Sequence, residues 1–262
     1  MAPQQALAAL LLLTALVFHC RCELFPTLAA GDEAVMQRCA ERINATQHSD
    51  DYHDYHEPSL NPCEWGGDFD LQVTCSKTTT PGAARVISLT WYGASGDLTD
   101  LGLEELDALQ NLSITSAPQF TGGGGSEQVS LTVSSAWATG LTSLQSFQYH
   151  LGTLKHFDAL FVKDGFPALK QLSIDQVDLS GDYPAGGLPK AVDGAFPVLT
   201  QLTITNCGIR AFPSTWGSSN GMLGGLQNLE LGSNAYGTKL RVLQCHMTVV
   251  LDQRMPEGVA QC

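Results

Sequence analysis

The residues with the clearest capacity for chemistry lie in the tract 48–57, where histidine and carboxylate side chains alternate. His53 and His56 could bind a borderline divalent ion together with Asp50 or Glu57, because imidazole and carboxylate groups both ligate such ions. The tract lacks the two histidines one helical turn apart, with a glutamate between them, that zinc hydrolases use. We therefore interpret it as a solvated linker and predict no metal and no cofactor, with a metal-dependent secreted enzyme centred on these histidines as an alternative.

Other catalytic patterns do not favour an enzyme. In Gly93-Ala94-Ser95-Gly96 the serine is spaced differently from a G-x-S-x-G nucleophile motif. The glycines 122–125 are not followed by the lysine and hydroxyl residue of a phosphate-binding loop, so we interpret them as a flexible connection. Carboxylates are scattered over turns instead of gathered in a pocket that would raise their pKa. We therefore predict a non-catalytic protein.

The element that would position any functional side chain is a short strand that recurs along the chain. Apolar residues occupy relative positions 1, 4 and 6, and a small, amide or apolar residue occupies position 9, in Val86/Leu89/Trp91/Ala94, Leu169/Leu172/Ile174/Val177, Leu199/Leu202/Ile204/Cys207 and Leu226/Leu229/Leu231/Asn234. Weaker copies begin at Leu109 and Leu144. This spacing predicts a parallel strand whose alternate side chains face a core, followed by a turn in which position 9 satisfies backbone groups. Because such a unit cannot bury its apolar face alone, copies must stack.

This pattern resembles the leucine-rich repeat family, whose signature L-x-x-L-x-L-x-x-N/C-x-L is met in full by residues 199–209. Residues 94–98 and 179–184 resemble the L-x-G-x-I-P turn of the plant-type subclass. The resemblance covers roughly residues 32–236. It implies an α/β solenoid, a curved parallel β-sheet coil with an N-terminal helical cap. Residues 129–133 alternate apolar and polar side chains, and we predict that they form a further, irregular coil.

The cysteines extend the resemblance to the N-terminal end. Asn61-Pro62-Cys63-Glu64-Trp65-Gly66-Gly67, followed by Cys75, resembles the plant-type N-terminal cap, and the resemblance implies a Cys63–Cys75 disulfide. Upstream, the apolar spacing in 32–43 predicts an amphipathic helix with Asp32 as N-cap and Cys39 on its inner face.

Two different roles are expected of the later cysteines. Cys207 holds a position-9 site and is interpreted as a buried thiol. Cys245 and Cys262 could join at the far end of the chain.

Localisation is predicted from the first residues and from the charge. Residues 6–18 are apolar and are followed by Cys20-Arg21-Cys22, which favours a secretion signal and hence an extracellular protein. Attachment to the cell surface is the alternative if the chain is a shortened product of a longer gene. A net charge of -13 argues against nucleic-acid and anionic-membrane partners, and no second apolar run predicts a membrane span. The predicted organisation is signal peptide 1–22, N-terminal cap 23–85, leucine-rich repeats 86–238 and irregular C-terminal tail 239–262.

Two asparagines lie in N-x-S/T acceptor sequences for glycans, Asn44 and Asn111. Asn44 lies at the end of the predicted cap helix. Asn111 lies at an outward position of a strand, where a glycan would compete with a partner.

The predicted binding surface is the strand face that points away from the core, at relative positions 3, 5, 7 and 8. These positions carry mostly hydroxyl and amide side chains, including Gln176 and Asn206, which suit an extended peptide or a glycan chain. The residues selected as ligand-binding on this concave face are Tyr92, His150, Gln171, Asp175, Thr203, Thr205 and Glu230. We therefore hypothesise a secreted or cell-surface protein that binds an extracellular protein, peptide or glycan, with a self-associating structural or adhesion protein as the alternative.

Overall fold

The structure is a computed structural model, and it describes residues 27–46, 61–65, 71–94, 96–116, 129–179, 188–190, 192, 194–210, 225–232, 234 and 248–250. The predicted signal peptide, the histidine tract 48–57 and the glycines 122–125 lie outside these ranges. So do Cys245 and Cys262 and most of the predicted C-terminal tail.

Short strands dominate the described chain, with one long helix near its beginning. The helical elements are α2 (Ala30–Thr46), η1 (Pro62–Glu64), η2 (Thr99–Leu101), η3 (Leu103–Glu105), α3 (Ser135–Gly140) and η4 (Phe157–Leu160). The strands are β1 (Leu71–Cys75), β2 (Val86–Ala94), β3 (Asn111–Ser116), β4 (Ser130–Thr132), β5 (Ser146–Lys155), β6 (Gln171–Asp178), β7 (Gln201–Thr205), β8 (Asn228–Glu230) and β9 (Thr248–Val250). Strand β9 falls within the tail that the sequence predicts to be irregular.

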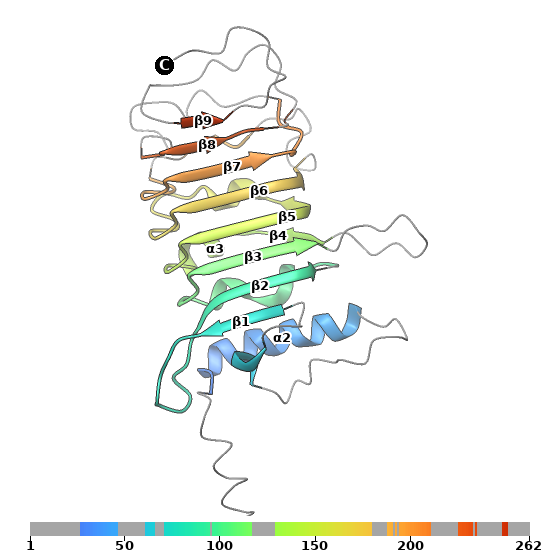
Figure 1. The fold of residues 1–262 in the computed structure, drawn as a ribbon, viewed down its shortest axis with the longest axis vertical. Helices are drawn as coiled ribbons and strands as arrows, with labels where there is room; N and C mark the ends of the chain where they lie inside the picture. The colour runs from blue at the N-terminus through green and yellow to red at the C-terminus, as the bar shows by residue number, and fades with distance from the viewer. Residues whose placement is uncertain are drawn as a thin grey trace, which may run out of the picture.

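All the described strands belong to one open sheet, so the fold is mixed α/β with a mostly parallel sheet. Its order is β1-β2-β3-β5-β6-β7-β8-β9, and β4 pairs with β5 away from this path. Only β1 runs antiparallel to its neighbour among these pairs. The strands follow one another along the long axis of the molecule, with α2 beside β1 at one end and β9 at the other (Figure 1).

The apolar positions of neighbouring strands are in register, as the spacing predicts. Leu172 on β6 is opposite Leu202 on β7, which is opposite Leu229 on β8. Each of these leucines is 1% exposed and belongs to one continuous core. Burying a leucine side chain contributes about 1.5–3 kcal/mol, so the row stabilises the parallel pairing and fixes its register.

Four strands bend at the same relative position, the eighth. Gly93, Leu151, Gln176 and Asn206 all have positive φ angles there, between 54° and 68°. A left-handed conformation is open to glycine but costs a residue with a Cβ about 1–2 kcal/mol. In this conformation, Gln176 within β6 and Asn206 directly after β7 follow the outward-facing residues Asp175 and Thr205.

Strand β4 differs from the further coil that the sequence predicts. Strand β3 pairs directly with the first half of β5, and β4 pairs with the second half, so β4 is not inserted between them in the main sheet. Leu131 lies opposite Leu154, and an isolated parallel bridge joins Ser130 to Asp97. Alternation of apolar residues therefore identified the strand but not its neighbours.

Helix α2 is joined to β2 by a buried carboxylate. The helix begins at Ala30, so Asp32 lies in its first turn and is not the N-cap that the sequence predicts. Asp32 is 1% exposed and accepts hydrogen bonds from the Val86 backbone N–H (2.7 Å) and from Arg85 Nε (3.0 Å). The helix is thereby fixed over the first strands, and its inner face buries Cys39 completely.

Two further contacts complete this end of the fold. Cys63 and Cys75 form the disulfide that the family resemblance implies, joining η1 to the end of β1. Arg38 of α2 donates from Nε to the Leu101 carbonyl (2.7 Å) and pairs with Glu105.

Candidate functional site

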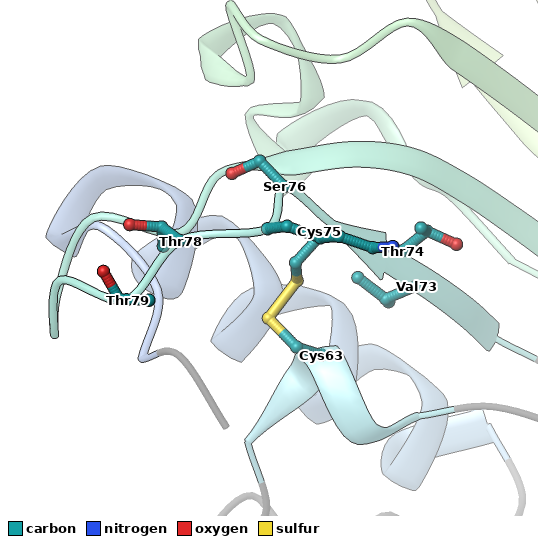
Figure 2. Close-up of a pocket in the computed structure, with 8 residues that line it drawn as sticks. Cys63, Val73, Thr74, Cys75, Ser76, Thr78 and Thr79 are labelled. Carbon is teal, nitrogen blue, oxygen red and sulfur yellow. A yellow bond between two sulfur atoms is a disulfide. The ribbon is translucent and has the colours of Figure 1, made fainter. Parts of the chain in front are cut away.

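A hollow of about 790 Å³ lies beside the disulfide. It is lined by Cys63, Val73, Thr74, Cys75, Ser76, Lys77, Thr78 and Thr79, and Figure 2 shows the disulfide bond among these residues. Hydroxyl groups and one lysine supply its polar atoms, and no acid–base pair converges on it. The described lining residues therefore supply no chemistry that would single the hollow out as an active site.

The outward face of the sheet carries rows of polar side chains. Along β6, Leu172 and Ile174 are buried, whereas Ser173 and Asp175 alternate with them on the other face and are partly exposed. Strand pairing aligns the rows Asn111/Ser146/Gln171/Gln201/Asn228, Ser113/Gln148/Ser173/Thr203/Glu230 and Thr115/His150/Asp175/Thr205. Because adjacent strands are about 4.8 Å apart, each row is a ladder of hydrogen-bonding groups at that spacing.

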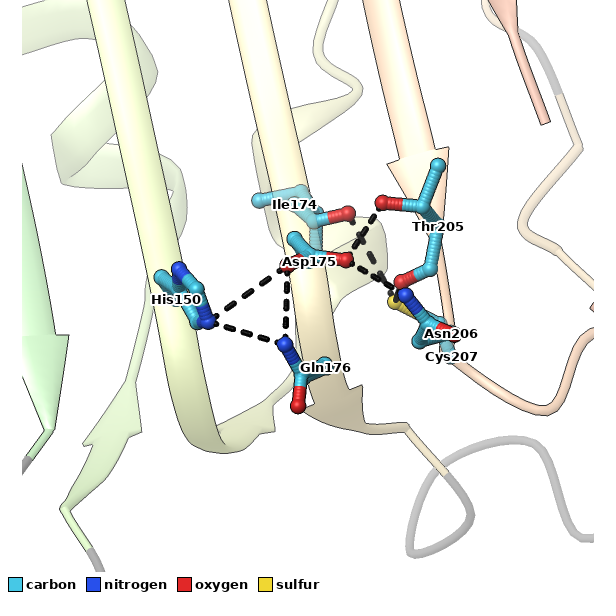
Figure 3. Close-up of polar contacts among 7 residues, drawn as sticks. All are labelled: His150, Ile174, Asp175, Gln176, Thr205, Asn206 and Cys207. Atoms are coloured by element: carbon cyan, nitrogen blue, oxygen red, sulfur yellow. Dashed lines mark hydrogen bonds and ion pairs between the residues drawn. The ribbon is translucent and has the colours of Figure 1, made fainter. Parts of the chain in front are cut away.

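One point on this face has a dense network of side-chain contacts, which we call the Asp175 cluster: His150, Asp175, Gln176, Thr205 and Asn206 (Figure 3). Asp175 Oδ1 accepts hydrogen bonds from Thr205 Oγ1 (2.5 Å) and Asn206 Nδ2 (2.9 Å). Asp175 Oδ2 accepts from Gln176 Nε2 (3.2 Å) and lies 3.4 Å from His150 Nε2. Three strands thus converge on one carboxylate.

These contacts change the acidity of the carboxyl group. Partial burial raises the pKa of Asp175, but hydrogen bonds from Thr205, Asn206 and Gln176, and the charge of a protonated His150, outweigh it. The net result is a pKa below the ordinary value. Asp175 is therefore an anion at neutral pH, although only a quarter of its side chain is exposed.

The network also orients two amide groups. Gln176 and Asn206 both turn their amide nitrogens towards Asp175, so their carbonyl oxygens point away from it. Figure 3 shows the Gln176 oxygen on the side remote from the carboxylate. Asp175 Oδ1 has two donors and Oδ2 has one, so the amide oxygens and the remaining lone pair of Oδ2 are acceptors available to another molecule.

The cluster includes three of the predicted ligand-binding residues, and the other four lie elsewhere on the same sheet. His150, Asp175 and Thr205 are paired in register across β5, β6 and β7. The remaining positions are Gln171 at the start of β6, Thr203 on β7, Glu230 on β8 and Tyr92 on β2. Tyr92 is 48% exposed and is separated from β5 by β3.

Gln176 and Asn206 are the functional candidates that the selection of site residues missed. Both fall at outward positions in the sequence pattern, but nothing in their type marks them as contacts of Asp175. Gln176 lies within β6 and Asn206 directly follows β7, both have positive φ, and both amide nitrogens donate to the Asp175 carboxylate. For Gln176 the available signal is a polar residue at relative position 8 next to an acidic position 7, and for Asn206 it is a polar position 8 on the strand that pairs with Asp175.

A second group of polar contacts lies in the turn after the strands and has a structural role. Asn234 Nδ2 donates to the carbonyl oxygens of Ile204 and Leu231, and its Oδ1 accepts from the backbone N–H groups of Cys207 and Ile209. The Cys207 thiol contacts the Thr205 carbonyl at 3.0 Å. Position 9 therefore satisfies buried backbone groups, as predicted from the spacing.

The two free cysteines among the described residues, Cys39 and Cys207, are poor nucleophiles. Burial raises the pKa of both Cys39 and Cys207 to about 12, although Arg38 lowers the first and backbone hydrogen bonds lower the second. Both side chains are buried, and both are thiols at neutral pH.

The structure describes only some of the residues that were predicted to carry a glycan or were considered for catalysis. Asn111 is exposed at the start of β3, whereas the side chain of Asn44 lies outside the described residues, as do His53 and His56. A G-x-S-x-G spacing does occur at 217–221, also outside them. Across the residues that the structure describes, no three potential metal ligands gather.

No helix among the placed residues is long and apolar enough to cross a membrane. Neither a protein-family model, nor a curated protein, nor a solved structure matches this chain.

Proposed function

We propose that this chain is a secreted leucine-rich-repeat protein that binds an extracellular protein, peptide or glycan on the outward face of its sheet, without catalysis. The recurring apolar spacing and the in-register parallel pairing of Leu172, Leu202 and Leu229 support a stacked arrangement of this type. The Cys63–Cys75 disulfide weakly supports an oxidising compartment.

The observation that carries the proposal is the set of aligned polar rows on the outward face. They extend over β3, β5, β6, β7 and β8 and contain hydroxyl and amide groups with few charges. An extended peptide or a polysaccharide presents donors and acceptors repeatedly along its length, so it can bond to several strands at once. A pocket for a small molecule is not required for such binding.

The proposal is tested by screening the full secreted chain against glycan and extracellular-peptide arrays. The screen is repeated with Tyr92→Ala combined with Asp175→Ala, which removes the aromatic and the anionic group from the outward face. Lys163→Ala is the matched control, because Lys163 is exposed in the turn between η4 and β6. Binding should fall at least about tenfold in the double variant and remain unchanged in the control.

Two outcomes contradict this assignment. Binding that is equally strong in the double variant places the site on another surface. Hydrolysis or other chemical change of an arrayed compound, with loss of that activity on substitution of described residues, indicates an enzyme. Light scattering on the same preparation distinguishes the rival structural role, which requires self-association.

A further inference from the structure

Two contacts in the Asp175 cluster compete for one atom. His150 Nε2 lies 3.1 Å from Gln176 Nε2 and 3.4 Å from Asp175 Oδ2. The Gln176 nitrogen is a donor, so this contact is a hydrogen bond only if His150 Nε2 carries no proton. The contact with the carboxylate is a hydrogen bond only if the same nitrogen carries one. Hence the two bonds cannot exist together.

With Nε2 unprotonated, the amide group of Gln176 is held from two sides. One hydrogen of its nitrogen is directed at Asp175 Oδ2 and the other at His150 Nε2. Its carbonyl oxygen then points away from both, and the carbonyl oxygen of Asn206 likewise points away from Asp175. This state presents two hydrogen-bond acceptors next to a fixed negative charge.

With His150 fully protonated, Nε2–H faces the Gln176 amide nitrogen, and two donors meet. The arrangement is relieved if the amide turns over, so that its oxygen accepts from the imidazolium and its nitrogen points away. His150 Nε2 lies 3.4 Å from Asp175 Oδ2, so the positive charge of the imidazolium then offsets the charge of the carboxylate. Before protonation, the exposed edge of the cluster presents the Gln176 carbonyl oxygen, an acceptor, beside the Asp175 anion. After protonation, it presents the Gln176 amide nitrogen, a donor, beside a His150–Asp175 ion pair with no net charge.

No other charged group interferes with this exchange among the placed residues. From β3, the residue opposite His150 is Thr115, and from β6 the facing groups are Asp175 and Gln176. His150 is the one charged group that acts on the acidity of Asp175, and no described lysine or arginine pairs with this carboxylate. The unprotonated state therefore offers a place for a cation from outside.

We propose that the Asp175 cluster binds a basic side chain of a peptide partner through the carbonyl oxygens of Gln176 and Asn206, and that protonation of His150 releases it. The inference rests on the proposed function, since it specifies the ligand and the regulation of the same face. The net charge of -13 favours a basic partner. Acidification weakens the binding of a basic side chain in two ways. It turns the Gln176 carbonyl oxygen away from the partner, and it adds a positive charge on His150.

The test uses the full chain, labelled with ¹⁵N, and the probe acetyl-Gly-Arg-Gly-amide. The neutral citrulline analogue controls for charge. Side-chain amide signals of Gln176 and Asn206 are followed by NMR at about pH 7.5 and about pH 5, either side of the usual histidine range. Gln37, an exposed amide on α2 and outside the polar rows, is the internal reference. His150→Gln removes the switch, and His156→Asn is the matched histidine control beyond the end of β5.

The arginine peptide should shift both amide signals at the higher pH and bind about tenfold or more weakly at the lower pH. In His150→Gln the affinity should be the same at both pH values, and in His156→Asn it should change as in the unaltered chain. Without peptide, the Gln176 amide signal should follow protonation of the His150 ring.

Three results each overturn the inference: no response to the arginine peptide at the higher pH, equal binding at both pH values in the unaltered chain, or loss of binding on acidification in His150→Gln. A partner found on the arrays that binds this face without responding to acid leaves the proposed function intact while refuting the switch. If no array ligand binds but the arginine peptide binds and is released by acid as expected, the proposed function is refuted and the switch is retained.

Discussion

The connection between α2 and the sheet makes a quantitative prediction about Asp32. Replacing Asp32 with alanine removes the acceptor for the buried Val86 N–H and for Arg85. An orphaned backbone donor costs about 1–3 kcal/mol. Loss of a charge-assisted bond would add about 1.5–3 kcal/mol, but Arg85 is 34% exposed and can regain water, so this second contribution is reduced to about 1 kcal/mol.

We therefore expect Asp32→Ala to lower the free energy of unfolding by about 2–4 kcal/mol. The matched control is Asp107→Ala, because Asp107 pairs with the same arginine but is 59% exposed. An exposed ion pair of this kind is worth about 0–1 kcal/mol. Each variant thus removes one carboxylate partner of Arg85, a buried one in Asp32→Ala and an exposed one in Asp107→Ala.

Urea unfolding at neutral pH, followed by circular dichroism, measures both variants against the unaltered chain. The midpoint should fall clearly for Asp32→Ala, with little change in the slope of the transition, and hardly at all for Asp107→Ala. If the two variants lose the same free energy, the buried carboxylate does not hold the helix to the sheet. A double-mutant cycle that combines each variant with Arg85→Ala then measures how much of the lost free energy of unfolding comes from the pairing with Arg85.

Four further predictions concern the buried cysteines, Asn234 and Asp175. Cys39 and Cys207 should react with a thiol reagent at pH 8 only after denaturation, since burial keeps their pKa at about 12, and rapid labelling of the native protein would contradict the buried assignment. Their raised folded-state pKa also means that the stability they contribute is fully present below the unfolded value near 9 and is lost as pH rises towards 12, a slope that alkaline unfolding measures. Asn234→Ala should cost about 2–4 kcal/mol in thermal unfolding, because buried backbone groups lose their partners, whereas Asn228→Ala, exposed on β8, should cost under about 0.5 kcal/mol. Asp175 has a lowered pKa, so its contribution to stability should be present above about pH 4 and be lost as pH falls through the folded value; equal acid unfolding curves for Asp175→Asn and the unaltered chain would refute this.

The sheet could be predicted from sequence because its apolar spacing is both local and repeated. Leu172, Leu202 and Leu229 hold the same relative position in their segments, and one side-chain row requires one register. Strand β4 shows the limit of this reasoning, since alternation identifies a strand without naming the strand it pairs with. The second half of β5, with which it pairs, follows Leu151, whose positive φ is a backbone feature that leucine does not suggest.

The candidate site was less predictable for a similar reason. The outward positions of His150, Asp175 and Thr205 follow from the spacing, because alternate residues share a face. The roles of Gln176 and Asn206 depend on which way two amide groups turn, which is set by contacts across three strands. Asp32 likewise has the residue type and place of a helix cap, but its acceptors are used by a strand more than fifty residues away.

The alignment of the polar rows limits how a partner can follow them. The rungs of a row repeat about every 4.8 Å, whereas side chains on one face of an extended peptide repeat about every 6.7 Å. Two peptide intervals come close to three strand intervals, at about 13.5 Å and 14.4 Å. A straight peptide lying across the sheet would thus meet equivalent rungs only at every third strand, and its strongest contacts would be separated by strands that it passes over.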